Sequence, residues 1–181
     1  PVRDEQANVG PCIAALMAQK SVAQLEEIII NDQSTDNTVE ELKAAIGADS
    51  RFSVIEADGP RVGWLGKVSA LQTGFARSTG EVIICLDADV RLEPDAISRA
   101  VNQLQGLSLD FVSPYPRQLD GTFSEKLIQP LLNWSWMSTV PLRVAEKSAR
   151  TSLAVANGQF FLVRKSALDQ IGGFTAIAAE V

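Results

Sequence analysis

Short apolar runs alternate along this chain with longer amphipathic segments, and this alternation constrains the fold more than any other feature. Residues 27–31, 52–57 and 81–86 predict buried strands, and residues 38–46 and 67–78 predict the helices between them. Strands that alternate with helices form a largely parallel sheet with helices on both faces. The sequence therefore predicts a Rossmann-like α/β fold in a single domain.

The second half of the chain continues this pattern with shorter elements. A helix is expected over residues 94–105, with Pro94 in its first turn, where a missing N–H costs no hydrogen bond. Residues 110–113 and 159–164 predict two further strands. Residues 166–171 predict a helical turn, which the following Gly-Gly pair should stop.

The stretch 124–144 is rich in Leu, Trp and Met, and Pro130 and Pro141 interrupt it. Because proline removes a helical hydrogen bond, we expect a kinked or broken helix here. The apolar stripe has two interpretations. It packs on the sheet, or, with Lys126 and Arg150 nearby, it lies at a membrane surface.

Charge and composition exclude several functions. A net charge of -6 at pH 7, without a Lys/Arg-rich run, argues against a nucleic-acid partner. The chain has no histidine, which removes Ser-His-Asp triads, Cys-His pairs and His-bound zinc. Cys12 and Cys85 are expected to be buried thiols rather than a disulfide. No stretch is long and apolar enough to span a bilayer, so the segment itself is expected to be soluble.

Asp87-Ala88-Asp89 directly follows the apolar run 81–86. Residues i and i+2 of an extended chain point to the same side, so both carboxylates can face one ligand. Ligands of open α/β sheets bind beyond the carboxyl ends of the strands. Two carboxylates there suit Mg²⁺ or Mn²⁺, with water and diphosphate oxygens completing the coordination. The alternative is a solvated turn that caps the next helix.

Two other polar segments flank helix starts. The segment Asn31-Asp32-Gln33-Ser34-Thr35-Asp36 offers oxygens that can accept hydrogen bonds from a nucleobase or ribose, although an ordinary capping turn has the same composition. Gly63-Trp64-Leu65-Gly66-Lys67 places flexible backbone and an ammonium near helical N–H groups, which can hold an anion. A loop with a solvated lysine explains this second segment equally well, and its spacing is not that of a Walker loop.

In their order and spacing, these motifs resemble the signatures of family 2 glycosyltransferases with the GT-A fold. The matching residues are Pro1-Val2-Arg3-Asp4-Glu5 with Asn8, Asp32-Gln33-Ser34-Thr35-Asp36, Gly66-Lys67, Ala70-Leu71-Gln72-Thr73-Gly74, Gly80-Glu81 and Asp87-Ala88-Asp89. A bacterial branch often found beside hopanoid or carotenoid biosynthesis genes is similar at three places. These are Gly63-Trp64-Leu65-Gly66-Lys67, Ser113-Pro114-Tyr115-Pro116-Arg117-Gln118 and Phe123-Ser124-Glu125-Lys126.

The resemblance implies transfer of a sugar from a nucleoside-diphosphate sugar to an acceptor hydroxyl, lipid-like, with inversion and a divalent metal, Mn²⁺ or Mg²⁺. It implies that Asp89 coordinates the metal and that Asp87 faces the metal and the ribose. It places Asn157, Gly158 and Gln159 near the sugar and the acceptor. The residues it assigns to the nucleotide sugar are Arg3, Glu5, Asp32, Ser34, Asp36, Lys67 and Asp87. Many members have two acidic residues where this chain has Asn31-Asp32, and we expect Asp32 to keep the base contact.

The resemblance also implies elements outside this sequence. Members begin with an apolar strand before the Pro-x-Arg segment, and they carry a catalytic base after the Gly-Gly-Phe turn. We therefore expect residues 1–181 to form one nucleotide-sugar-binding domain that lacks its first strand and its catalytic part. The base is expected beyond Val181, so this segment alone should be inactive. The whole protein is expected at the cytoplasmic face of a bacterial membrane, with the membrane surface as a partner.

Two other functions fit some of these residues. A phosphatase of the haloacid dehalogenase type also has Asp-x-Asp after an apolar strand, and Val90 fits its motif. The polar turn at residues 32–36 and the late position of the Asp-x-Asp motif argue against it. A non-catalytic nucleotide-sugar-binding domain would use the same binding residues, and only turnover distinguishes it from the enzyme.

Overall fold

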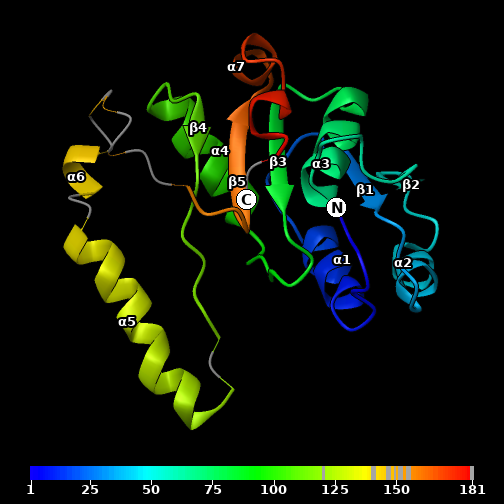
Figure 1. The fold of residues 1–181 in the computed structure, drawn as a ribbon, viewed down its shortest axis with the longest axis horizontal. Helices are drawn as coiled ribbons and strands as arrows, with labels where there is room; N and C mark the ends of the chain where they lie inside the picture. The colour runs from blue at the N-terminus through cyan, green and yellow to red at the C-terminus, as the bar shows by residue number, and fades with distance from the viewer. Residues whose placement is uncertain are drawn as a thin grey trace.

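The structure, a computed structural model, describes residues 1–119, 121–139, 142–145, 148, 150, 153 and 156–179. Helices and strands alternate along the chain, as Figure 1 shows, which confirms the predicted α/β class. Within these residues, no helix combines the length and the apolar character needed to cross a membrane.

The strands form two groups that lie beside each other. β1 (Glu27–Asn31) and β2 (Phe52–Glu56) pair in parallel. β3 (Val82–Leu86), β5 (Phe160–Arg164) and β4 (Phe111–Val112) lie in the order β3-β5-β4, with β5 antiparallel to both neighbours. All five strands were predicted to within two residues at each end, whereas the antiparallel direction of β5 was not.

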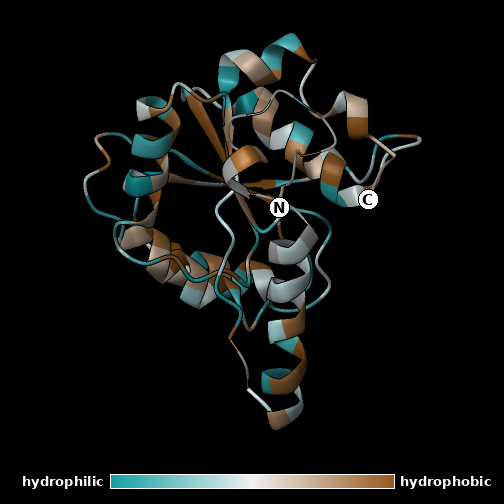
Figure 2. Ribbon diagram, turned by 90° about the vertical axis from the view of Figure 1, so that its left-hand side faces the viewer, coloured by the Kyte–Doolittle hydropathy of each residue, from teal (hydrophilic) through white to brown (hydrophobic). Residues whose placement is uncertain are grey.

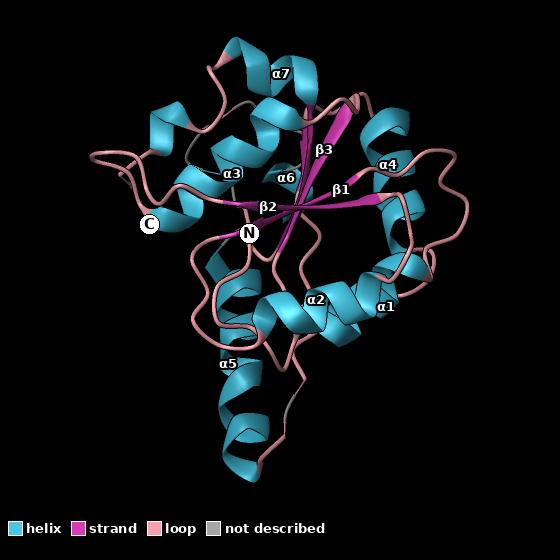
Figure 3. Cartoon of the chain, turned by 90° about the vertical axis from the view of Figure 1, so that its right-hand side faces the viewer, coloured by secondary structure: helices cyan, strands magenta, loops and turns pink. Residues whose placement is uncertain are grey.

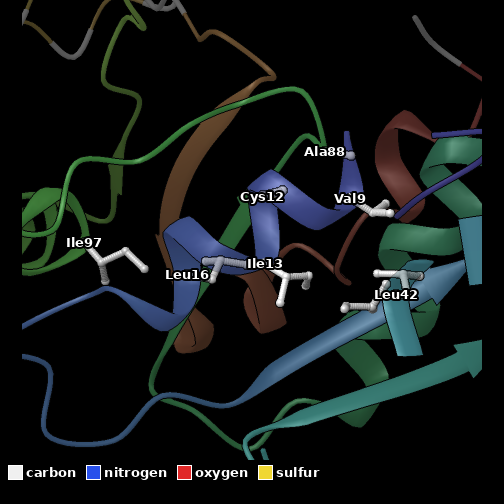
Figure 4. Close-up of a cluster of buried hydrophobic side chains, with 8 residues drawn as sticks. Val9, Cys12, Ile13, Leu16, Leu42, Ala88 and Ile97 are labelled. Carbon is white, nitrogen blue, oxygen red and sulfur yellow. The ribbon is translucent and has the colours of Figure 1, made fainter. Parts of the chain in front are cut away.

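Helices cover both faces of the strands, as predicted (Figure 3). α1 (Val9–Met17), α2 (Thr38–Ile46) and α4 (Ala96–Gly106) pack on one face, and α3 (Gly66–Arg77) and α7 (Lys165–Gln170) pack on the other. Figure 4 shows buried side chains of the first face, which include Val9, Cys12, Ile13, Leu16, Leu42, Ala88 and Ile97. The cluster on the second face includes Val68, Phe75, Ile83, Cys85, Val163, Leu168 and Phe174.

Two helix starts differ from the prediction. α1 was not predicted from the sequence. Pro11 lies in its first turn and is tolerated there, since the first four N–H groups of a helix lack intrahelical partners. α4 begins at Ala96 rather than Pro94, after a turn in which the Ala96 N–H donates to the Glu93 carbonyl at 2.9 Å. Pro94 therefore precedes the helix instead of opening it.

α5 (Phe123–Thr139) contains Pro130 and continues through it, so the kinked or broken helix expected over residues 124–144 is not broken at this proline. A short α6 (Leu142–Ala145) follows; the second proline, Pro141, lies outside the described residues. α5 extends away from the strands and their helices (Figure 1).

The predictions for the cysteines and for the end of α7 are confirmed. Cys12 and Cys85 are free and buried, and burial raises the pKa of the two thiols to about 11 and about 12. Gly172 and Gly173 follow α7 with φ angles of 78° and 71°. Glycine adopts this left-handed backbone without strain, so the pair ends the helix.

Candidate functional site

The predicted site residues gather where β1 and β3 end and α3 begins. The start of α3 connects the two strand ends. Its second residue, Lys67, places Nζ 2.7 Å from Oδ1 of Asp87, which directly follows β3. Its first residue, Gly66, lies against Asp32, which directly follows β1.

Asp32 carries a buried carboxylate that lies next to the first residue of α3. Its side chain is 8% exposed, and its nearest cation is Arg3, with Nη1 3.8 Å from Oδ2. A Cβ atom added at position 66 would lie 2.8 Å from the same oxygen, so only glycine permits this approach. The close packing brings the positive end of the α3 dipole to the Asp32 carboxylate.

The turn after β1 is held by side-chain hydrogen bonds. Asn31 Oδ1 accepts from the N–H of Ser34 at 3.2 Å and from its hydroxyl at 2.6 Å. The Asn31 amide donates to Glu56 Oε2 at 2.6 Å, which ties the turn to the end of β2. Asn31, which stands where many family 2 members have an acidic residue, therefore holds this turn in place.

Thr38 connects the amino-terminal segment to this turn, and sequence reasoning missed it. It is fully buried, and its hydroxyl accepts the Glu5 N–H at 2.7 Å and donates to Asp36 Oδ1. Asp36 also accepts the N–H of Thr38, the first residue of α2, at 3.0 Å. The hydrogen bond from the Thr38 hydroxyl is the largest cause of the lowered pKa of Asp36. The Asp-x-Thr spacing at a helix start was the available signal.

Asp87 and Asp89 have different surroundings. The Asp87 N–H pairs with the Gln159 carbonyl at 2.9 Å, so this residue continues the ladder to β5. Residues 88 and 89 then form a turn closed by the Val90 N–H on the Asp87 carbonyl at 3.2 Å. The extended geometry assumed for the motif thus ends at Asp87, and Asp89 is exposed in the turn.

Arg91 anchors this turn and was not predicted. Its guanidinium donates to the carbonyls of Ala88 at 2.8 Å and Val90 at 3.1 Å, and to Asn8 Oδ1 at 3.0 Å. The Asn8 amide in turn donates to Glu5 Oε2 at 2.7 Å. This chain of hydrogen bonds joins the Asp-x-Asp turn to the segment that carries Arg3 and Glu5.

The segment Asn157-Gly158-Gln159 lies beside the Asp-x-Asp motif through the pairing of Gln159 with Asp87. Asn157 is fixed by Ser113, whose hydroxyl accepts its N–H at 2.7 Å. A Cβ atom at Gly158 would meet nothing within 4 Å, so space is open there. The structure thus brings the predicted acceptor residues next to the predicted metal residues.

The side chains at this site meet the needs of a metal ion only in part. In the described ranges, no three His, Cys, Asp or Glu side chains form a group able to hold an ion. Of the two carboxylates predicted to bind a metal, Asp87 contacts the Lys67 ammonium and Asp89 is exposed in the turn. Mg²⁺ binds typically through one or two carboxylates plus phosphate oxygens, so a cation here would need the oxygens of a bound diphosphate as further ligands.

Comparison with known proteins connects this geometry to a family. Dolichol-phosphate mannosyltransferase of Mycosarcoma maydis is 25% identical over 200 residues, which is 100% of this chain and 67% of the relative. Undecaprenyl-phosphate 4-deoxy-4-formamido-L-arabinose transferase of Yersinia pestis is 36% identical over 105 residues, 56% of this chain and 31% of the relative. The chain thus spans between about a third and two thirds of these relatives.

Solved structures share the fold. The mannosyltransferase PcManGT from Pyrobaculum calidifontis, solved in complex with GDP-Man and Mn²⁺, superposes with a TM-score of 0.72 at 20% identity, covering 96% of this chain and 45% of that one. The predicted GT-A architecture is therefore confirmed. The model of "Glycosyl transferase family 2" matches residues 1–172. This match, in line with the site at the ends of β1 and β3, shows that the chain belongs to glycosyl transferase family 2.

Proposed function

We propose that this chain is the donor-binding domain of an inverting glycosyltransferase that moves a sugar from a nucleoside diphosphate to a lipid-like acceptor. The observation that carries the proposal is the position of Gly66 and Lys67 at the start of α3, between Asp32 and Asp87. One end of this site offers a buried hydrogen-bond acceptor, the Asp32 carboxylate. The other end offers two carboxylates and an ammonium. That distribution suits a ligand with a nucleoside at one end and a diphosphate at the other.

The nucleoside end is assigned to the turn after β1 and the segment before α1. Asp32 is buried and lies against Gly66, so its carboxylate can accept a hydrogen bond from a base N–H with little competition from water. Ser34 and Asp36 accept the N–H groups of Asp4 and Gln6, which ties this turn to the segment that carries Arg3 and Glu5. Arg3 reaches Asp32 itself. Sequence and geometry support the same set of residues.

The diphosphate end is assigned to Lys67, Asp87 and Asp89. Lys67 is half exposed, and its ammonium can donate to phosphate oxygens while it stays near Asp87. The first N–H groups of α3 lie beside it and favour an anion. When bound, Mn²⁺ or Mg²⁺ would neutralise the negative charge on the departing diphosphate.

The acceptor is assigned to the open side of Asn157, Gly158 and Gln159. Two of the relatives described above carry names with dolichol phosphate and undecaprenyl phosphate, and both are polyprenyl phosphates. This supports a lipid-like acceptor, and the similarity to the hopanoid and carotenoid branch supports a terpenoid one. A carboxylate beyond residue 181 is proposed as the base that takes the acceptor proton.

The family match separates the phosphatase from the proposed enzyme, but not the non-catalytic binding domain. Membership in the glycosyltransferase family disfavours the phosphatase, which rested on the Asp-x-Asp motif after an apolar strand and on Val90. A non-catalytic nucleotide-sugar-binding domain shares every contact described here. Turnover by the whole protein separates it from the enzyme.

The test is transfer of label from UDP- and GDP-sugars by the whole protein, with Mn²⁺, to undecaprenyl phosphate or to a polycyclic terpenoid alcohol. Organic-extractable label with one donor and one acceptor is the expected result. Donor binding without transfer to any acceptor would support the non-catalytic alternative. Phosphate release from a simple phosphomonoester would support the phosphatase.

A further inference from the structure

Two segments without a role in the site described above contact each other. One is the middle of α3, and the other is the Gly172-Gly173-Phe174 turn after α7. Gln72 of α3 accepts the Phe174 N–H on Oε1 at 2.8 Å, across 102 positions of the chain. A Cβ atom added at Gly173 would lie 2.5 Å from the same oxygen, so a side chain at this position would push the turn away from α3.

Burial makes the hydrogen bond from Phe174 costly to lose. Phe174 is 5% exposed, and its ring meets the Phe75 ring edge to face, with the ring centroids 6.2 Å apart. A buried N–H that loses its acceptor costs more free energy than an exposed one, because water cannot take the acceptor's place. Gln72 therefore fixes the point at which the chain leaves the Gly-Gly turn.

The residues after this turn run along α3 towards its start. η2 (Thr175–Ile177) follows Phe174, and the Ala178 carbonyl then accepts the Leu65 N–H at 2.8 Å. Leu65 precedes Gln72 by about two helical turns, or roughly 10 Å along the helix axis. The segment 174–178 is therefore attached to α3 at two points, one in the middle of the helix and one at its amino end.

The attachment at the amino end reaches the donor site. Leu65 is the extended residue directly before α3, with φ -73° and ψ 143°. Gly66 and Lys67 follow it, and they contact the carboxylates at the ends of β1 and β3. A shift of the Leu65 backbone would therefore move both contacts.

We propose that Gln72 is a positioning residue of the donor site. It holds the Gly173-Phe174 turn, and the segment 174–178 in turn holds Leu65, so that Lys67 faces the diphosphate. Gln72 acts through the backbone and does not touch the ligand. The part of Lys67 in this proposal rests on the proposed function, whereas the hold of Gln72 on Leu65 does not.

Hydrogen exchange tests whether Gln72 holds Leu65. Four forms of the chain are compared: unaltered, Gln72→Ala, Gln72→Glu, which keeps an acceptor at the same place, and Gln103→Ala, which removes an exposed glutamine of α4. In Gln72→Ala we expect the Leu65 and Phe174 amides to exchange about tenfold faster, the effect of one lost hydrogen bond. Gln72→Glu and Gln103→Ala should leave both rates unchanged. The Glu27 amide, which donates to a carbonyl beside β2, is the internal control.

A double-mutant cycle tests whether this hold acts through Lys67. Calorimetry measures the binding of UDP and GDP to the unaltered chain, Gln72→Ala, Lys67→Ala and the double variant. We expect Gln72→Ala to weaken the tighter nucleotide about tenfold in the unaltered chain, but less than about twofold in Lys67→Ala, because the two residues act on one contact. A glutamine with a purely structural role would cause the same loss in both backgrounds.

Three outcomes would overturn the proposal. Unchanged exchange at Leu65 in Gln72→Ala would show that the turn does not hold the start of α3. Equal acceleration at Glu27 would show that Gln72 stabilises only the fold as a whole, and equal affinity losses in both backgrounds would exclude action through Lys67. If Leu65 responds alone but the unaltered chain binds neither nucleotide, the hold of Gln72 on Leu65 is confirmed and the proposed function fails instead.

Discussion

At the residue scale, Asp32 combines burial, a weak ion pair and contact with a helix start. We predict that Asp32→Ala weakens binding of the free nucleoside diphosphate by about 1–3 kcal/mol, the cost of leaving a buried polar group of the ligand unpaired. Calorimetry with UDP and GDP measures this. Asp110→Ala is the matched control, because Asp110 is exposed and precedes β4 at the opposite end of the strands. A loss seen with the sugar donors but not with the free nucleotides would contradict the assignment.

Glu27 links stability to pH. Burial raises its pKa from 4.5 to about 7, and its buried Oε1 finds no hydrogen-bond partner among the described residues. A carboxyl whose folded pKa is raised binds its proton more tightly in the folded state, so stability falls as pH rises from 4.5 to about 7. We predict a loss of about 1–3 kcal/mol across this window, measured by urea unfolding. Glu27→Gln should remove this slope, and a variant that keeps the full slope would exclude Glu27 as its source.

At the element scale, α5 exposes an apolar stripe. Phe123, Leu127, Leu131 and Trp134 are between 59% and 82% exposed, and their spacing places them along one side of the helix. Figure 2 shows brown, hydrophobic residues along this protruding helix. Packing on the sheet, one of the two interpretations from the sequence, does not hold for these four side chains. The side chain of Trp136, which belongs to the same apolar stretch, lies outside the described part.

We predict that α5 binds lipid surfaces. Co-sedimentation with vesicles of phosphatidylglycerol and phosphatidylcholine should be lost in the Leu127→Ser, Trp134→Ser double variant, because Leu and Trp supply the apolar contact of an interfacial helix. Val62→Ser is the control, since Val62 is a fully exposed apolar residue elsewhere. Equal sedimentation of all three proteins, each folded by circular dichroism, would show that the stripe does not meet the membrane.

At the scale of the whole molecule, hydrophobic periodicity predicted where the strands lie. It did not predict the direction of a strand or contacts between residues far apart in the chain. The apolar runs of β1 and β3 showed where each strand ends. They therefore predicted that Asp32 and Asp87 lie at these strand ends. The antiparallel direction of β5 leaves no trace in its apolar pattern, because burial does not depend on strand direction. Arg91 joins the Asp-x-Asp turn to Asn8 across 83 residues, and no local signal marks such a contact.

The whole domain is proposed to bind a nucleoside-diphosphate sugar through a divalent cation, and one titration tests this most directly. Binding of GDP-mannose and UDP-glucose is measured by calorimetry with Mn²⁺ and with EDTA, for the unaltered chain, Asp89→Asn and the control Asp110→Asn. We predict that one donor binds at least about tenfold more tightly with Mn²⁺, roughly 1.4 kcal/mol, and that Asp89→Asn alone abolishes this gain. Metal-independent binding, or an unchanged metal effect in Asp89→Asn, would contradict the account.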